Sequence, residues 1–237
     1  MTIWTTPERE QLRKTVRSFV EQDILPHLNQ WESDGEIPRE LHKKAAALGL
    51  LGAGFPEDVG GEGGDLADAI LICEEMHQAG ASGGLFASLF TNGIALPHLV
   101  AAGDPEHIEK WVRPTLAGEK IGSLGVTEPD TGSDVAGIRT TAVRDGDHYI
   151  VNGAKMFITS AVRADFVTTA VRTGGPGAGG VSLLVVERGT PGFTVSSKLK
   201  KMMKACWINW PSGVMMSRKN QTNTTTLSCC QMLIKHV

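Results

Sequence analysis

Hydrophobic residues recur every three or four positions through the first half of the chain, a period typical of helices packed on a core. The first segment begins at Thr6-Pro7, where a hydroxyl can cap free amides and proline suits the first helical position. Pro26 is expected to end this helix. Its apolar residues share one face: Leu12, Val16, Phe19, Val20 and Ile24.

Four further helical segments are predicted before residue 118. The second opens at Pro38 and ends at Gly49, where glycine suits a left-handed cap. Its apolar positions are Leu41, Ala45 and Leu48. The others run from Asp65 to about His77, from Leu85 to Val100 with interruptions near Asn92-Gly93 and Pro97, and from Asp104-Pro105 to a stop at Pro114.

From Lys120 the period changes to two, which is typical of β-strands. Asp145-Gly146 and Asn152-Gly153 are dipeptides typical of hairpin turns. Short strands without intervening helices favour an antiparallel sheet or barrel over a Rossmann unit, so the chain is predicted to be α+β. The expected strands are Ile121–Val126, Thr140–Val143, His148–Val151, Ala154–Thr159, Ala164–Arg172 and Val181–Glu187.

Composition excludes several classes of protein. No run of 18 apolar residues occurs, which argues against a membrane span. The net charge of −3 argues against nucleic-acid binding through overall positive charge. Four cysteines without a CxxC pattern favour neither a disulfide framework nor a zinc site. No signal or transit peptide is evident, so a cytoplasmic location is expected.

Charge is distributed unevenly along the chain. All 26 Asp and Glu lie at or before Glu187, and the last 50 residues have none. The expected domains are a helical domain over 1–118, an incomplete β domain over 119–202 and an atypical tail over 203–237. The tail is interpreted as replaced or out of frame, with a mobile basic tail as the alternative.

Two segments of the β domain could carry chemistry. SLGVTEPDTGSD runs from Ser123 to Asp134 and turns at Pro129 and Gly132, so that backbone N–H groups and hydroxyls can face a polar ligand. NGAKMFITS, from Asn152, puts an aromatic ring and a hydroxyl on one strand face. Taken singly, the first is a capped surface turn and the second ordinary sheet packing.

Other residues and motifs have structural interpretations. Glu74, Glu75 and Glu128 are expected to be solvated or helix-face carboxylates. His77, His98 and His107 show no metal-ligand spacing. The GGPGAGG loop at 174–180 lacks the G-K-[ST] of a phosphate-binding loop and opens no helix.

The two segments together, following five helices and an AGEK turn, resemble the acyl-CoA dehydrogenase family. The resemblance covers residues 3 to about 202. It rests on RSFVEQDILPHLNQWESDGEIPRELHKKAAALGLLGAGFPEDVGG, LAGEKIGSLGVTEPDTGSDVAGIRT, YIVNGAKMFITSA, LLVVERGTPGF and KLKKM. It implies a helical domain followed by a small antiparallel, barrel-like β domain.

The resemblance also implies roles for individual residues. Leu124, Val126 and Thr127 would contact the flavin of FAD, and Gly132 would lie near its phosphate-bearing side chain. Ser133 would lie there too and would touch the acyl-CoA substrate. Phe157, Ile158 and Thr159 would flank the flavin ring, with Phe157 where many members have Trp. Phe86 and Phe90 either line the acyl pocket or belong to the core.

The chemistry implied is α,β-dehydrogenation of an acyl-CoA thioester, as in the β-oxidation of fatty acids. A carboxylate base removes the α-proton while the β-hydride passes to the flavin, and hydrogen bonds to the thioester carbonyl lower the pKa of the α-proton. An electron-transfer flavoprotein would then accept the electrons. Family members form homo-oligomers.

The sequence departs from the family after KLKKM. Relatives continue into a four-helix domain of about 150 residues, the size of an ordinary domain. That domain carries the catalytic glutamate in most members, so the catalytic residue of this chain is unknown. The alternative to an active dehydrogenase is therefore an inactive truncated or frameshifted fragment. Acyl-CoA oxidases or flavin monooxygenases with this fold are a third possibility.

Overall fold

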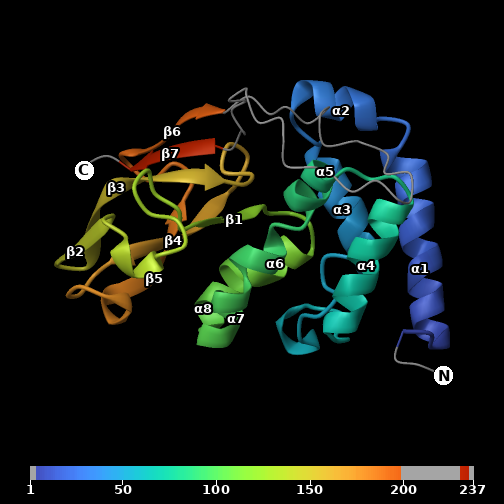
Figure 1. Cartoon of the computed structure of the whole chain (residues 1–237). Helices are drawn as coiled ribbons and strands as arrows, with labels where there is room; N and C mark the ends of the chain where they lie inside the picture. Colours follow the sequence, from blue (N-terminus) through green and yellow to red (C-terminus); the bar gives the residue numbers. More distant parts are fainter. Residues whose placement is uncertain (1–3, 199–229, 235–237) are drawn as a thin grey trace, which may run out of the picture.

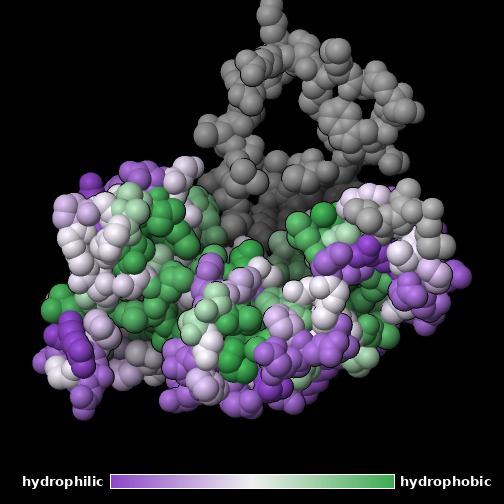
Figure 2. All heavy atoms as spheres, turned by 90° about the horizontal axis from the view of Figure 1, so that it is seen from below, coloured by the Kyte–Doolittle hydropathy of each residue, from purple (hydrophilic) through white to green (hydrophobic). Residues whose placement is uncertain are grey.

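The computed structural model describes residues 4–198 and 230–234. A helical half and a sheet-bearing half lie side by side, with β1 running between them (Figure 1). The predicted order of a helical domain followed by a β domain is confirmed. Hydrophobic residues gather in patches among charged ones on the face in Figure 2.

The helical elements occupy the first half of the chain. In order they are α1 (Pro7–Phe19), the π-helical turn η1 (Val20–Ile24), α2 (Leu28–Asp34), α3 (Arg39–Ala47), the 3-10 turn η2 (Glu57–Val59), α4 (Leu66–Gln78), α5 (Gly83–Leu89), α6 (Asn92–Ala95), α7 (Pro97–Ala102), α8 (Pro105–His107), the π-helical turn η3 (Ile108–Val112) and α9 (Arg113–Leu116).

Strands and two further 3-10 turns follow. They are β1 (Gly122–Gly125), η4 (Val135–Gly137), β2 (Thr141–Asp145), β3 (His148–Ile158), β4 (Phe166–Arg172), η5 (Ala178–Gly180), β5 (Val181–Glu187), β6 (Phe193–Lys198) and β7 (Cys230–Ile234). The tail expected over 203–237 lies outside the described residues except for 230–234, where β7 pairs with β3 and β6.

The helix boundaries follow local chemistry. The hydroxyl of Thr6 accepts the amide of Arg9 at 3.3 Å, and Asp65 forms a capping box with Asp68 at the start of α4. Gly49 has φ +74°, so the left-handed cap after α3 is confirmed. The predicted interruptions near Asn92 and Pro97 are also present.

In the helical half one helix was missed and two expectations were wrong. α2 was not predicted, because none of its residues is buried and its apolar pattern is correspondingly weak. Leu48 is 43% exposed instead of facing the core. Pro114 does not stop the last helix, because it occupies the first turn of α9, where no intrahelical N–H partner is required.

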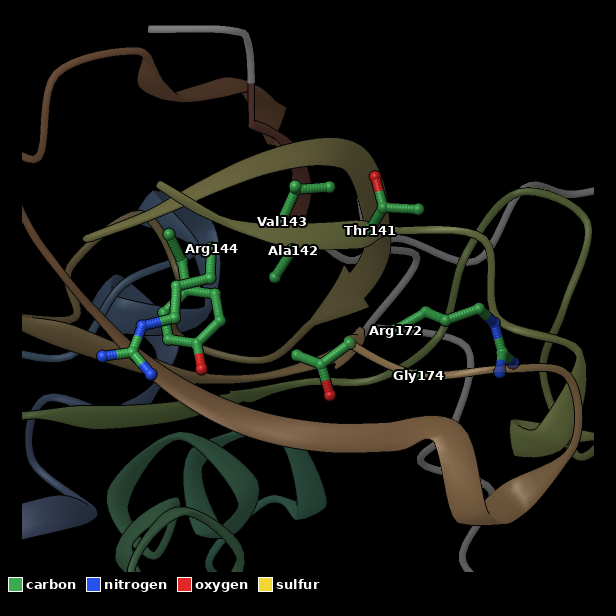
Figure 3. Close-up of a pocket in the computed structure, with 8 residues that line it drawn as sticks. Thr141, Ala142, Val143, Arg144, Arg172 and Gly174 are labelled. Carbon is green, nitrogen blue, oxygen red and sulfur yellow. The ribbon is translucent and has the colours of Figure 1, made fainter. Parts of the chain in front are cut away.

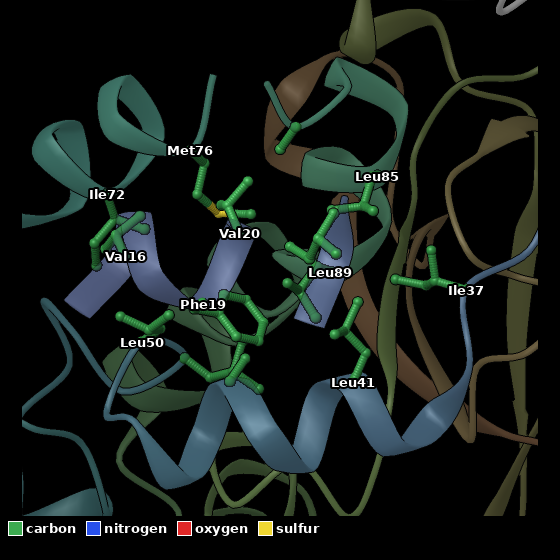
Figure 4. Packing of buried hydrophobic residues seen from close by; sticks show 14 residues of the cluster. Val16, Phe19, Val20, Ile37, Leu41, Leu50, Ile72, Met76, Leu85 and Leu89 are labelled. Atoms are coloured by element: carbon green, nitrogen blue, oxygen red, sulfur yellow. The ribbon is translucent and has the colours of Figure 1, made fainter. Parts of the chain in front are cut away.

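The helical core is built from the faces that the sequence predicts. Val16, Phe19 and Val20 of α1 and η1 pack against Leu41 of α3 and Met76 of α4 (Figure 4). Among the described helices, none is both long and apolar enough to span a membrane. One bent pair, Gly83–Leu89 with Asn92–Ala102, meets the criteria of length and composition only when joined across a 54° bend.

The sheet is mixed and open, which corrects the antiparallel, barrel-like expectation. Its order is β1-β4-β2-β3-β7-β6, with β5 on the other edge of β4. β1 pairs with β4 in parallel, as does the first residue of β2, whereas the hairpins and β7 pair antiparallel. Parallel pairing arises because the chain crosses over between β1 and β4 instead of returning by a tight turn.

Asn152-Gly153 is not a hairpin turn, because β3 runs through it without a break. A Cβ at Gly153 would lie 2.3 Å from the Thr140 hydroxyl oxygen and 2.7 Å from its Cα. Glycine is therefore required here by the close approach of the neighbouring backbone and not by a change of direction.

β4 joins the sheet to the helices. Phe166 at its start is fully buried and lies 4.7 Å from the ring centroid of Trp111 in η3. Leu96, Leu99 and Leu116 belong to the same cluster. On the opposite side, Val167 packs with Ile158 in a third cluster within the sheet half.

His42 of α3 makes stability depend on pH. It is only 3% exposed. Burial, aided by the charge of Arg163, lowers the pKa of His42 from 6.5 to about 4. As the pH falls below 6.5, His42 is protonated in the unfolded chain before it is protonated in the folded one. The contribution of His42 to the free energy of unfolding is therefore complete above pH 6.5 and is lost as pH falls toward 4.

We expect His42→Leu to flatten the pH dependence of the free energy of unfolding between pH 6.5 and 4. The wild-type loss attributable to His42 is of the order of 3 kcal/mol. Urea denaturation at several pH values measures it, with His98→Leu on the exposed face of α7 as the control. Equal slopes for His42→Leu and wild type would contradict the assignment.

Candidate functional site

The two candidate segments lie side by side in the folded chain. β1 leads directly into Val126 and Thr127, and the end of β3 runs beside them. The Met156 amide donates to the Thr127 carbonyl at 2.7 Å. The Ser123 hydroxyl donates to the Thr159 carbonyl. The β1 segment and the end of β3, about 30 positions apart in the sequence, are thus joined by one hydrogen bond before Phe157 and another after it.

A buried ion pair connects the same segments. Lys155 Nζ lies 2.7 Å from Glu128 Oε1 and donates to the Val126 carbonyl at 3.0 Å. Lys155 is fully buried and Glu128 is 6% exposed. Burial alone would raise the pKa of Glu128, but hydrogen bonds from Lys155 and from the 139–140 segment lower it below its ordinary value.

Phe157 occupies a strained position between its neighbours. Its φ is +58°, which is uncommon for a bulky residue, and its side chain is 49% exposed. The register of β3 against β7 shifts between Lys155 and Ile158, so Phe157 lies in a bulge. Its ring therefore remains available at the surface.

The remaining predicted flavin contacts differ in how deeply they are buried. Ile158 is 2% exposed and packs in the third cluster, so its side chain is core and only its backbone remains to meet a ligand. Leu124, Val126, Thr127 and Thr159 are half-buried. Within the described residues, the hydroxyls of Thr127 and Thr159 have no protein partner, so both remain able to bind a ligand.

Gly132 and Ser133 lie further along the same loop and are exposed. Glu128 closes this loop, because Oε2 accepts the Arg139 amide at 2.6 Å and Oε1 accepts the Thr140 amide at 2.9 Å. A Cβ at Gly132 would meet no atom within 4 Å. Ser133 is thus exposed on a loop whose two ends are held together by the hydrogen bonds of Glu128.

The carboxylates Glu74, Glu75 and Glu128 are all engaged in ion pairs. Arg13 lies 3.1 Å from Glu74 and 3.1 Å from Glu75, and Arg17 also contacts Glu75. Glu75 is 1% exposed, so of the two expected surroundings it has the helix-face one, on the buried side of α4, and not the solvated one. Glu128 is likewise buried rather than solvated.

His77, Phe86 and Phe90 contact other residues of the helical half. His77 Nδ1 lies 2.7 Å from the Cys73 carbonyl oxygen and its ring stacks at a tilt on Phe86. Phe86 and Phe90 stack at 4.8 Å and pack on the helical core. No His, Cys, Asp or Glu group in the described part of the chain could hold a metal ion.

A hollow of about 380 Å³ lies elsewhere on the sheet half, between β2 and the loop after β4 (Figure 3). Thr141, Ala142 and Val143 line one side, and Arg172 and Gly174 the other. None of the candidate flavin contacts lines it. The guanidinium of Arg172 is already bonded to the carbonyls of Ile138, Ala136, Gly175 and Gly177.

Family models match most of the chain. The acyl-CoA dehydrogenase N-terminal domain matches residues 6–119, and the acyl-CoA dehydrogenase middle domain matches residues 123–210, which include both candidate segments. The chain belongs to the acyl-CoA dehydrogenase family.

Named relatives agree with this assignment. The mitochondrial long-chain specific acyl-CoA dehydrogenase of Mus musculus is 39% identical over 202 residues, which are 84% of this chain and 46% of the relative. A solved Mycobacterium smegmatis protein assigned as an acyl-CoA dehydrogenase is 58% identical with a TM-score of 0.88, and the match covers 100% of this chain and 57% of that one.

A glutaryl-CoA dehydrogenase from Mycobacterium smegmatis, solved in complex with FADH2, has a TM-score of 0.79 and 27% identity. That match covers 98% of this chain and 54% of the neighbour. The chain thus spans about half the length of the relatives that it matches.

Sequence reasoning missed Lys155 and misassigned Glu128. Alternation gave no signal, because in a regular strand a lysine two positions before the exposed Phe157 lies on the same face as that ring. The bulge between Lys155 and Ile158 breaks this alternation, so that Lys155 is buried and Phe157 is exposed. A buried lysine requires a buried acid, and Glu128 is the acid at the end of β1.

We expect Phe157→Gly to be more stable than Phe157→Ala by about 1 kcal/mol. Both variants lose the ring, but only glycine adopts positive φ without strain. Tyr149 is the matched control, since it is a 46% exposed aromatic on the same strand outside the positive-φ set. Tyr149→Ala should have a higher free energy of unfolding than Tyr149→Gly. The same order of Ala and Gly at positions 149 and 157 would contradict the presence of backbone strain at Phe157.

Proposed function

We propose that residues 4–198 form the flavin-contacting wall and the substrate-facing loop of an FAD-dependent acyl-CoA dehydrogenase. The single observation that carries this is the joining of the Val126–Thr127 and Phe157–Thr159 segments into one surface. Phe157 of this surface is 49% exposed, and Thr127 and Thr159 are half-buried with hydroxyls that have no partner among the described residues. A flat ligand with a polar edge and an apolar face fits such a surface.

FAD, when bound, supplies the acceptor for the hydride that leaves the β-carbon of the acyl-CoA. Thr127 and Thr159 orient the ligand through hydrogen bonds, and Phe157 covers its apolar face. Ser133, exposed on the loop held by Glu128, contacts the phosphate-bearing part of the cofactor and the thioester substrate. The relative that contains FADH2 supports the choice of cofactor.

The general base lies outside the described residues in this proposal. Glu74 and Glu75 are held by Arg13, and Glu128 is held by Lys155. Glu75 and Glu128 are buried in their ion pairs and cannot approach a substrate α-carbon without losing their partners, whereas the half-exposed Glu74 lies on α4 in the helical half. The described residues therefore bind and orient, and turnover requires a carboxylate from elsewhere.

The wider role follows from the family. Electrons pass on to an electron-transfer flavoprotein, and the working assembly is a homo-oligomer. Among the structural neighbours, a chain from a solved structure that concerns the electron-transferring flavoprotein of Acidaminococcus fermentans has a TM-score of 0.83 and 27% identity, which supports flavin chemistry on this scaffold.

We expect the chain to bind FAD and shift its visible absorption spectrum. Phe157→Ala should raise the dissociation constant about tenfold, because a ring contact on the flavin face is lost. Tyr149→Ala, which removes an equally exposed ring from the same strand, should leave binding unchanged. A free-flavin spectrum with wild-type protein, or equal effects of the two variants, would contradict the proposal.

Addition of an acyl-CoA to the FAD-loaded chain tests the location of the base. Bleaching that persists in Glu74→Gln, Glu75→Gln and Glu128→Gln agrees with a base elsewhere, as does an absence of bleaching. Bleaching abolished by one of these three substitutions, in a variant that still binds FAD, would assign the base to that carboxylate and refute this part of the proposal.

A further inference from the structure

The ion pair of Lys155 and Glu128 is the shared anchor of three pieces of the candidate site. Lys155 Nζ binds the Val126 carbonyl and Glu128. Glu128 in turn accepts the amides of Arg139 and Thr140. Thus the exit of β1, both ends of the loop that carries Ser133, and β3 two residues before Phe157 converge on one pair of charges.

Stability alone does not account for this pair. Two charges removed from water carry a desolvation cost that their attraction does not reliably recover, and apolar replacements are often as stable. The pair is nevertheless fully enclosed, with Lys155 unexposed and Glu128 at 6%. What ions do better than apolar side chains is fix direction, because hydrogen bonds to a carboxylate and to backbone carbonyls have defined geometry.

The strained backbone next to Lys155 needs such fixing. A positive φ at Phe157 persists only where the surroundings over-determine it. On one side are the anchored Lys155 and the Met156 amide bound to Thr127. On the other side Ile158 is buried and the Thr159 carbonyl accepts from Ser123. Release of Lys155 would allow residues 156–158 to relax into a regular strand, which changes the face that Phe157 occupies.

We infer that Lys155 and Glu128 are positioning residues, whose ion pair holds Phe157, Thr127 and the Ser133 loop in the geometry that receives the flavin. This inference rests on the proposed function for the identity of the ligand. The positioning itself is a property of the protein without ligand. The pair acts through the backbone and does not touch the cofactor.

The test uses the full chain and the double variant Lys155→Met/Glu128→Gln. The double variant removes both charges, and the glutamine carbonyl keeps an acceptor for one of the two amides, that of Arg139 or that of Thr140, so the protein should remain folded. The matched control is Glu75→Gln, which removes a 1% exposed paired carboxylate from the helical half. Lys155→Met alone leaves Glu128 buried and unpaired and serves as a second, harsher variant.

Amide hydrogen exchange followed by mass spectrometry is the first measurement, without added ligand. In the double variant, peptides covering 126–140 and 155–160 should exchange about tenfold faster than in wild type, with the helical half unchanged. Glu75→Gln should leave these two regions protected while α1 and α4 loosen. Unchanged protection at 126–140 and 155–160 in the double variant would overturn the inference.

FAD titration is the second measurement. The double variant should bind FAD about tenfold more weakly than Glu75→Gln, although the two melt at similar temperatures. Equal affinities would overturn the inference even if exchange rises. Should the wild-type chain bind no FAD, the proposed function fails, and the exchange measurement still decides whether the pair fixes the two segments.

Discussion

The burial of β4 on both faces is the constraint on which the rest of this structure depends. Every residue from Phe166 to Val171 is buried. Phe166 packs on Trp111 of the helical half, and Val167 packs within the sheet half. Because one edge of β4 is paired along its length with β5, the other edge is left for β1 and β2. The position of β1, and so of Val126 and Thr127, follows from this strand.

Polar contacts at the start of β4 complete the arrangement. Asp165 Oδ2 accepts the Ile121 amide at 2.7 Å and pairs with Arg39 at the start of α3 at 2.5 Å. The helical half is thereby tied to the same point at which β1 enters the sheet. Gly122 allows the close packing, since a Cβ there would lie 2.7 Å from the Phe166 ring. The candidate site therefore inherits its position from both halves.

Local chemistry accounts for what the sequence could predict. The caps at Thr6, Asp65 and Gly49 depend on residues within four positions, and the buried face of α1 repeats with the helical period. Each can therefore be predicted from the sequence without knowledge of the fold. The two segments of the candidate site were found because their residue types are unusual together. Their adjacency was expected from the resemblance and is present in the hydrogen bond that the Met156 amide donates to the Thr127 carbonyl.

What the sequence could not predict depends on contacts between distant residues. Gly153 looks like a turn until Thr140 is seen against it, and Lys155 looks like a surface lysine until Glu128 is seen opposite. The parallel pairing of β1 with β4 spans a crossover that no short pattern encodes. Pro114 was misjudged because the register of its helix, and not proline itself, decides whether an N–H is missing.

The candidate site combines two unfavourable features within three residues, a buried lysine and an aromatic residue at positive φ. Either one would be removed by a substitution chosen for stability alone. Their proximity has a physical logic, since a strained backbone keeps its conformation only if its neighbours are fixed, and directional charged hydrogen bonds fix them. With the backbone so held, the ring at position 157 needs only to be flat and exposed. A larger aromatic ring would serve equally well at this position, because the geometry resides in the main chain and not in the size of the ring.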